Sequence, residues 1–126
     1  MEYIYENTIN GYGALASTFL EEGIVIFFGE NAPATLKDYC YTIDIKKARD
    51  VIAVGQTIEI GTNHYKITAV GEVAQKNLES LGHLTIAFTG ENESVLPGTI
   101  VVEKNRIPEI GNGTQIKIFN QGVEHE

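Results

Sequence analysis

Short segments in which hydrophobic and polar residues alternate make up most of the chain, and glycine-containing turns separate them. Alternation with a period of two is typical of β-strands that bury one face. Residues 56–60 and 64–70 alternate cleanly on either side of a Gly-Thr-Asn turn, which predicts a β-hairpin. Residues 23–28 are dense in Ile, Val and Phe and predict a buried strand. Further strands are expected at residues 3–9, 39–45, 84–88, 99–102 and 114–119.

Helical periodicity is confined to one or two places. Residues 73–81 carry apolar side chains at positions 73, 74, 78 and 81, and Gly82 follows as a typical residue for a helix C-terminus. Pro33 favours a shorter helix over residues 34–38. Many short strands with few helices predict a mainly β fold, a single small β-barrel or sandwich of short antiparallel strands with one or two short helices. The 126 residues are expected to form a single domain over positions 1–126.

The composition narrows the classes of partner. The formal net charge of −8 at pH 7 repels phosphate backbones and anionic lipid, so neither nucleic acid nor a membrane is an expected partner. The same charge favours a basic protein partner, and acidic surfaces also serve solubility alone. The longest apolar run covers residues 24–28, far short of the roughly 20 residues that a membrane span needs. The N-terminal residues lack a basic region followed by an apolar stretch, so we expect no signal peptide and a cytoplasmic location.

Few residues offer chemistry. The lone Cys40 excludes an intrachain disulfide and a thiolate zinc cluster, and a buried structural thiol is its expected state. The chain contains no Gly-x-Ser-x-Gly nucleophile motif, no Walker-type phosphate loop and no metal-ligand spacing, so we expect no cofactor and no metal.

The three histidines are the remaining candidates. His125 lies in the C-terminal tail, and His64 begins the second strand of the hairpin, where a solvated turn histidine is expected. His83 follows Gly82 at the junction of the predicted helix with the next strand. Such a corner either holds an imidazole at the surface or uses it to satisfy carbonyls at the helix end. An isolated histidine is able to act as a nucleophile toward phosphorus.

Five sequence blocks follow one another in order and without large gaps. They are Glu-Asn-Ala-Pro-Ala-Thr-Leu-Lys-Asp-Tyr-Cys at residues 30–40, Thr-Ala-Val-Gly at 68–71, Asn-Leu-Glu-Ser-Leu-Gly-His at 77–83, Phe-Thr-Gly-Glu-Asn-Glu at 88–93 and Leu-Pro-Gly-Thr-Ile at 96–100. Their combination resembles the glucitol/sorbitol-specific IIA component of the bacterial phosphoenolpyruvate-dependent sugar phosphotransferase system. The resemblance covers nearly the whole chain.

The resemblance implies a cytoplasmic phosphocarrier. Such a protein accepts a phosphoryl group on histidine from the histidine-containing phosphocarrier protein. It then passes the group to the IIB domain that serves the IIC sugar transporter, for uptake and phosphorylation of glucitol/sorbitol. The chemistry requires neither ATP nor a metal in this component, since donor and acceptor proteins supply the alignment.

The acceptor position departs from the family pattern. The histidine that the family uses follows the Tyr-Cys pair within a few residues, and the aligned residue here is Ile43, which has no nucleophile. His83 matches the Gly-His of the family and becomes the candidate catalytic residue, followed by His64, which has only a rough counterpart. Two hypotheses remain: a working phosphocarrier that uses His83, and a regulatory or docking homologue that binds the same partners without phosphotransfer.

Overall fold

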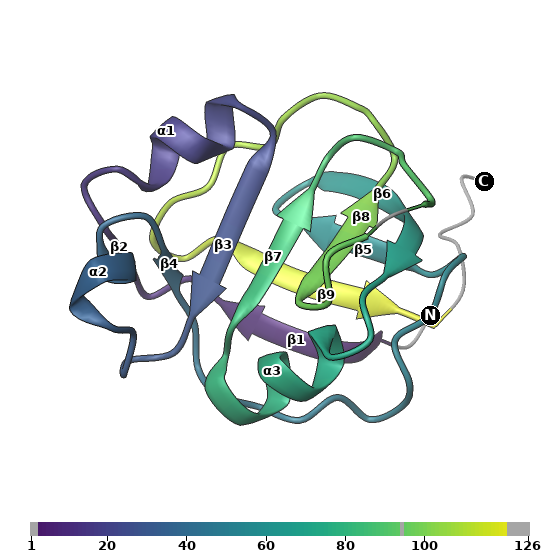
Figure 1. Ribbon diagram of the computed structural model, residues 1–126, viewed down its shortest axis with the longest axis horizontal. Coiled ribbons are helices and arrows are strands. Elements are labelled where there is room, and N and C mark those ends of the chain that lie inside the picture. The colour runs from purple at the N-terminus through teal and green to yellow at the C-terminus, as the bar shows by residue number, and fades with distance from the viewer. Residues whose placement is uncertain (1–2, 94, 121–126) are drawn as a thin grey trace.

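The computed structural model describes residues 3–93 and 95–120, and its strands form one nine-stranded sheet in the order β1-β9-β5-β6-β8-β7-β3-β4-β2. The sheet curls over itself, so that β3 and β7 cross over β1 and β9 with the core between them (Figure 1). Its strands are β1 (Tyr3–Thr8), β2 (Gly11–Tyr12), β3 (Ile24–Phe28), β4 (Tyr41–Thr42), β5 (Thr57–Ile60), β6 (Asn63–Val70), β7 (Leu84–Ala87), β8 (Thr99–Val102) and β9 (Gln115–Phe119). The helices are α1 (Ala16–Glu21), α2 (Ala34–Lys37) and α3 (Ala74–Leu81).

The mainly β fold expected from the sequence is confirmed. The β5–β6 hairpin forms with Ile60 opposite Asn63, and α3 ends at Gly82 as its periodicity predicts. Two features differ from the expectation of antiparallel strands with one or two helices. Strands β3 and β4 pair in parallel, and so do β7 and β8, because the connection through α2 and the loop after β7 are long enough to return the chain to the same end of the sheet. The structure also has one helix that the sequence did not predict, α1. It buries only Ala16 and Leu20 and so lacks a long apolar stripe.

The β4 segment is shorter than the strand predicted over residues 39–45. Strand pairing ends at Thr42. After it, the buried side chain of Asn7 makes the hydrogen bonds that a neighbouring strand would otherwise make to the backbone. The Asn7 carboxamide on β1 accepts the backbone N–H of Asp44 at 3.1 Å and donates to the Asp44 carbonyl at 2.7 Å. Further along, the Arg49 N–H donates to the Ile4 carbonyl at 2.7 Å. These bonds hold the segment after β4 against β1 and complete the enclosure of the core.

No helix within residues 3–93 and 95–120 is both long and apolar enough to cross a membrane. The longest of them, α3, has eight residues and buries only two side chains, Ala74 and Leu78. It packs across the end of β7, and this contact places the Gly82–His83 corner next to β3.

Candidate functional site

Strands β3 and β7 bring His83 beside Phe28. The two strands pair antiparallel, and the last registered pair joins Phe27 to Leu84, whose side chains are both buried in the core. Neighbouring residues of a strand face opposite sides, so Phe28 and His83 share the outer side of the sheet. Their rings stack with centroids 4.4 Å apart and planes inclined by 20°. The imidazole is therefore held flat against an aromatic ring at the end of α3.

The backbone of the α3 terminus fixes this position. Gly82 has a left-handed conformation with φ of 69°, and its N–H donates to the Leu78 carbonyl at 2.9 Å. The His83 N–H donates to the Asn77 carbonyl at 3.2 Å, so both residues after α3 satisfy carbonyls at its end, and the Gly82 bond is that of an αL helix terminus. A Cβ added at Gly82 would lie 2.8 Å from the backbone nitrogen of Gly29, just after β3. The close approach of these two backbones requires glycine and sets His83 against β3.

The imidazole of His83 is neutral at neutral pH and reaches solvent. Partial burial lowers the pKa of His83 from its usual value of 6.5, because desolvation disfavours the charged form. Among residues 3–93 and 95–120, no side chain or backbone group hydrogen-bonds either ring nitrogen, and no fully buried side-chain nitrogen or oxygen lacks a partner. The unpartnered ring nitrogens must therefore be accessible. A neutral, accessible imidazole has the lone pair that a nucleophile needs.

The Phe28 ring is the main candidate for the group that excludes water from the imidazole. In a Phe28→Leu variant we expect the pKa of His83 to rise towards 6.5, because one ring face becomes hydrated. An NMR titration of the His83 Cε1 proton between pH 4 and 8 measures the change. A matched variant is Phe19→Leu, which removes a ring of the same size that stacks on Tyr39 and should leave the His83 titration unchanged. Equal midpoints for His83 in the wild type and Phe28→Leu would contradict this account.

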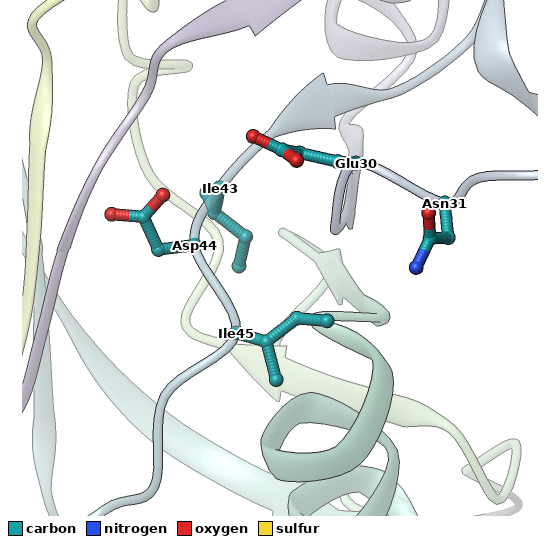
Figure 2. Close-up of a pocket in the computed structure, with 5 residues that line it drawn as sticks. All are labelled: Glu30, Asn31, Ile43, Asp44 and Ile45. Carbon is teal, nitrogen blue, oxygen red and sulfur yellow. The ribbon is translucent and has the colours of Figure 1, made fainter.

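A pocket of about 290 Å³ opens beside this corner, lined by Glu30, Asn31, Ile43, Asp44 and Ile45 (Figure 2). Ile43, at the position where the family resemblance places a histidine, is 1% exposed, and its N–H donates to the Phe28 carbonyl at 3.0 Å. Its side chain offers no atom that could accept a phosphoryl group. The structure agrees with the inference from the sequence that Ile43 cannot serve as acceptor. Its side chain is aliphatic and lies buried at the base of an acidic pocket.

His64 lies elsewhere, on β6, which β8 separates from β7 in the sheet. Its Nε2 is 2.7 Å from a carboxylate oxygen of Glu59, which faces it across the β5–β6 hairpin. Asn105 and Arg106 line a second pocket beside it. The structure therefore does not bring His64 and His83 together. Because residues alternate with a period of two on both sides of the turn, Glu59 lies opposite His64. This pair could therefore have been predicted from the sequence.

Cys40, another candidate from the sequence, takes no part in the site. Cys40 is 3% exposed, its Sγ donates to the Leu36 carbonyl at 3.1 Å, and burial raises the pKa of its thiol. His125 lies outside the described residues. Within residues 3–93 and 95–120, no group of three or more His, Cys, Asp or Glu side chains could hold a metal ion. The stacking of Phe28 on His83 was not foreseen, because it depends on the register between β3 and β7.

Fold and site together define a class: a small, mainly β protein that presents a neutral imidazole to solvent beside an acidic pocket. The model of the family described as PTS system glucitol/sorbitol-specific IIA component matches residues 4–117. The chain belongs to this family. The resemblance inferred from the sequence blocks is thereby confirmed, and the protein is a component of a sugar phosphotransferase system with a general role in phosphotransfer among its proteins.

Individual relatives agree with this assignment. The PTS system glucitol/sorbitol-specific EIIA components of Shigella flexneri and Escherichia coli (strain K12) are each 38% identical to this chain over 117 residues. The matches cover 93% of this chain and 95% of each relative. The crystal structure of a PTS system IIA component from Enterococcus faecalis V583 is similar with a TM-score of 0.78 and 30% identity. That similarity covers 89% of this chain and 97% of the other.

Proposed function

We propose that this protein is a cytoplasmic phosphocarrier that accepts a phosphoryl group on His83 from the histidine-containing phosphocarrier protein. It then passes the group to the IIB component of the transporter, which phosphorylates incoming glucitol/sorbitol. Family membership supports the general role. The observation that supports the residue is the neutral, solvent-reaching imidazole of His83, together with the buried aliphatic side chain of Ile43 at the usual acceptor position.

The proposed step is an in-line displacement at phosphorus. An unprotonated ring nitrogen of His83 attacks the phosphoryl group on the donor histidine and forms a new N–P bond. The N–P bond to the donor breaks as its electron pair returns to the donor imidazole. No proton has to leave His83 before the attack, because its lowered pKa keeps the ring neutral. Transfer to IIB repeats the displacement, with His83 as the leaving group, and the alignment comes from protein docking.

The direct test is phosphorylation in a reconstituted chain of transfer. The protein is incubated with labelled phosphoenolpyruvate, enzyme I and the histidine-containing phosphocarrier protein. We expect one label per chain, stable in base and labile in acid, as for a phosphohistidine. Adding the IIB component should discharge the label. A wild-type protein that stays unlabelled while enzyme I and the carrier protein become labelled would contradict the proposal.

A second candidate function is that of a docking or regulatory homologue without phosphotransfer. Ile43 favours it, because the aligned position carries no nucleophile and its side chain is buried. This function predicts binding to the carrier protein without any label. The two functions are therefore separated by measuring label and binding in the same preparation.

A further inference from the structure

The stack of Phe28 on His83 covers one face of the imidazole with apolar surface. The ring centroids are 4.4 Å apart and the planes are inclined by 20°, so the two rings lie nearly flat on each other. Phe28 itself is only 7% exposed, which keeps water out of the space between the rings. The nitrogen lone pair of an imidazole points outward in the plane of the ring. The stack therefore shields a face of the ring and leaves its edge open to a phosphoryl donor.

The backbone, and not the phenyl ring alone, sets the two rings beside each other. Gly29, which follows Phe28, donates its N–H to the Leu81 carbonyl at 3.0 Å. Gly82, which precedes His83, lies so close to Gly29 that a Cβ on it would stand 2.8 Å from the Gly29 nitrogen. Strands β3 and β7 are also paired up to this end. A change of the Phe28 side chain should therefore leave His83 in its place and remove only the cover.

Charged groups around the corner do not account for the state of the imidazole. Strands β3, β7 and β8 carry no charged residue within their bounds. The charged residues of the adjoining segments are Glu30, Asp44, Glu72, Lys76 and Glu79. The Glu79 carboxylate accepts the Ala48 N–H at 2.8 Å, and Asp44 accepts the Asn10 amide at 3.1 Å. Desolvation lowers the pKa of His83, so this pKa depends on the groups that displace water from the ring.

A phosphoryl group on a histidine is lost to water by a defined step. The oxygen of a water molecule attacks phosphorus, the N–P bond breaks, and its electron pair returns to the ring nitrogen. Both protons of the water stay with the phosphate that is released. The ring leaves most readily when its second nitrogen is protonated, because the departing imidazole is then neutral. An apolar cover disfavours that cationic form of the ring, so the cover should slow the loss.

We infer that Phe28 lengthens the lifetime of a phosphoryl group on His83 by shielding one face of its ring from water. Phe28 is thus a positioning residue, which contributes no reacting atom and acts through the imidazole. This inference rests on the proposed function, because a carrier has to keep its phosphoryl group until the IIB component docks. The π face of a phenyl ring also attracts a cation, which works in the opposite direction. The lowered pKa of His83 indicates that the loss of water outweighs this attraction.

The test measures how fast the phosphoryl group leaves His83 in a His64→Ala/His125→Ala background, where His83 is the one remaining histidine. Phosphoramidate, a small-molecule donor, phosphorylates the ring without any partner protein. Phosphorus NMR then follows the decay at a series of pH values. In Phe28→Leu we expect decay about threefold faster near pH 8, because the protonated fraction rises tenfold for each unit by which the pKa of the ring rises. The curve of decay rate against pH should move to higher pH, which a merely structural effect would not cause.

Two further variants make the comparison specific. Phe19→Leu removes a ring of the same size, which stacks on Tyr39 with centroids 4.9 Å apart, and should leave the decay at the background rate. If Phe28→Leu does not fold, Phe28→Met replaces it with the same expected result, because an unbranched side chain adapts to the space without supplying a ring. Circular dichroism shows which variants are folded.

Several outcomes would overturn the inference. Equal decay rates in the background protein and the folded Phe28 variant would remove the shielding role, and so would an equal acceleration in Phe19→Leu. Slower decay without Phe28 would show that the π face attracts the protonated ring instead. A ring that phosphoramidate leaves unmodified would show that the nitrogens of His83 are closed to donors, and would overturn the acceptor role as well.

Failure of the proposed function gives a different result. A protein that the phosphorylated carrier protein does not label, and whose chemically phosphorylated His83 decays faster without Phe28, loses the carrier role and keeps the shielding by Phe28. A protein that the carrier labels, and whose decay does not depend on Phe28, keeps the carrier role and loses the shielding.

Discussion

Labelling of this protein by the phosphorylated carrier protein is expected to fall to background when His83 is replaced by alanine, a loss of at least about 1000-fold in rate. The substitution removes the attacking nitrogen, and none of the described residues that line the adjacent pocket can replace that atom. Ile43 is aliphatic, and Glu30 and Asp44 repel the incoming phosphoryl group. The measurement is the initial rate of label incorporation, with circular dichroism to show that the fold persists. Folding should survive, because the ring is only half-buried and makes no side-chain hydrogen bond within the described chain.

The matched control is His64→Ala. It removes the same side chain from β6, where the imidazole is held by Glu59 at 2.7 Å. We expect the rate of labelling to stay within about twofold of the wild type. Persistent label in His83→Ala that disappears in His64→Ala would move the acceptor to the β5–β6 hairpin. Label lost in both variants would require a role for each histidine and would contradict the assignment to His83 alone.

The second large effect is expected at Gly82, where alanine should lower the free energy of unfolding by roughly 3 kcal/mol. Two causes add. The left-handed φ of 69° is unfavourable for a residue with a Cβ, and that Cβ would lie 2.8 Å from the Gly29 backbone nitrogen. Backbone on both sides leaves no flexible group to move away. Urea unfolding followed by circular dichroism measures the loss, and displacement of His83 should slow labelling of the folded fraction.

A Gly61→Ala variant separates the two causes. Gly61 in the β5–β6 turn has a similar φ of 61°, but its Cβ would meet only the Thr114 methyl at an ordinary 3.8 Å. We therefore expect a cost of about 1 kcal/mol from backbone strain alone. Equal destabilisation at the two glycines would show that the approach of α3 to β3 is looser than the structure indicates.

Local pattern was sufficient for the regular elements. Period-two alternation predicted the β5–β6 hairpin, the apolar run predicted β3, and apolar spacing with a terminal glycine predicted α3. Each of these signals is contained within about ten residues and is reinforced by burial of one face. Local pattern failed for α1, because its six residues bury only Ala16 and Leu20 and two apolar positions are too few to show a helical period; the helix packs into the core beside β3.

His83, the histidine that the sequence favoured, remains the candidate acceptor, and the structure adds the groups that surround it. The sequence alone determined a mainly β chain, an acidic surface, the absence of a nucleophile at Ile43 and the presence of a Gly-His corner after a helix. Only the tertiary structure decided that Phe28 covers the ring of His83, that Asn7 holds Asp44 in place, and that an acidic pocket adjoins the corner. These contacts join segments far apart in the chain. Their formation depends on strand order and register, which follow from burial of the whole core rather than from any local pattern.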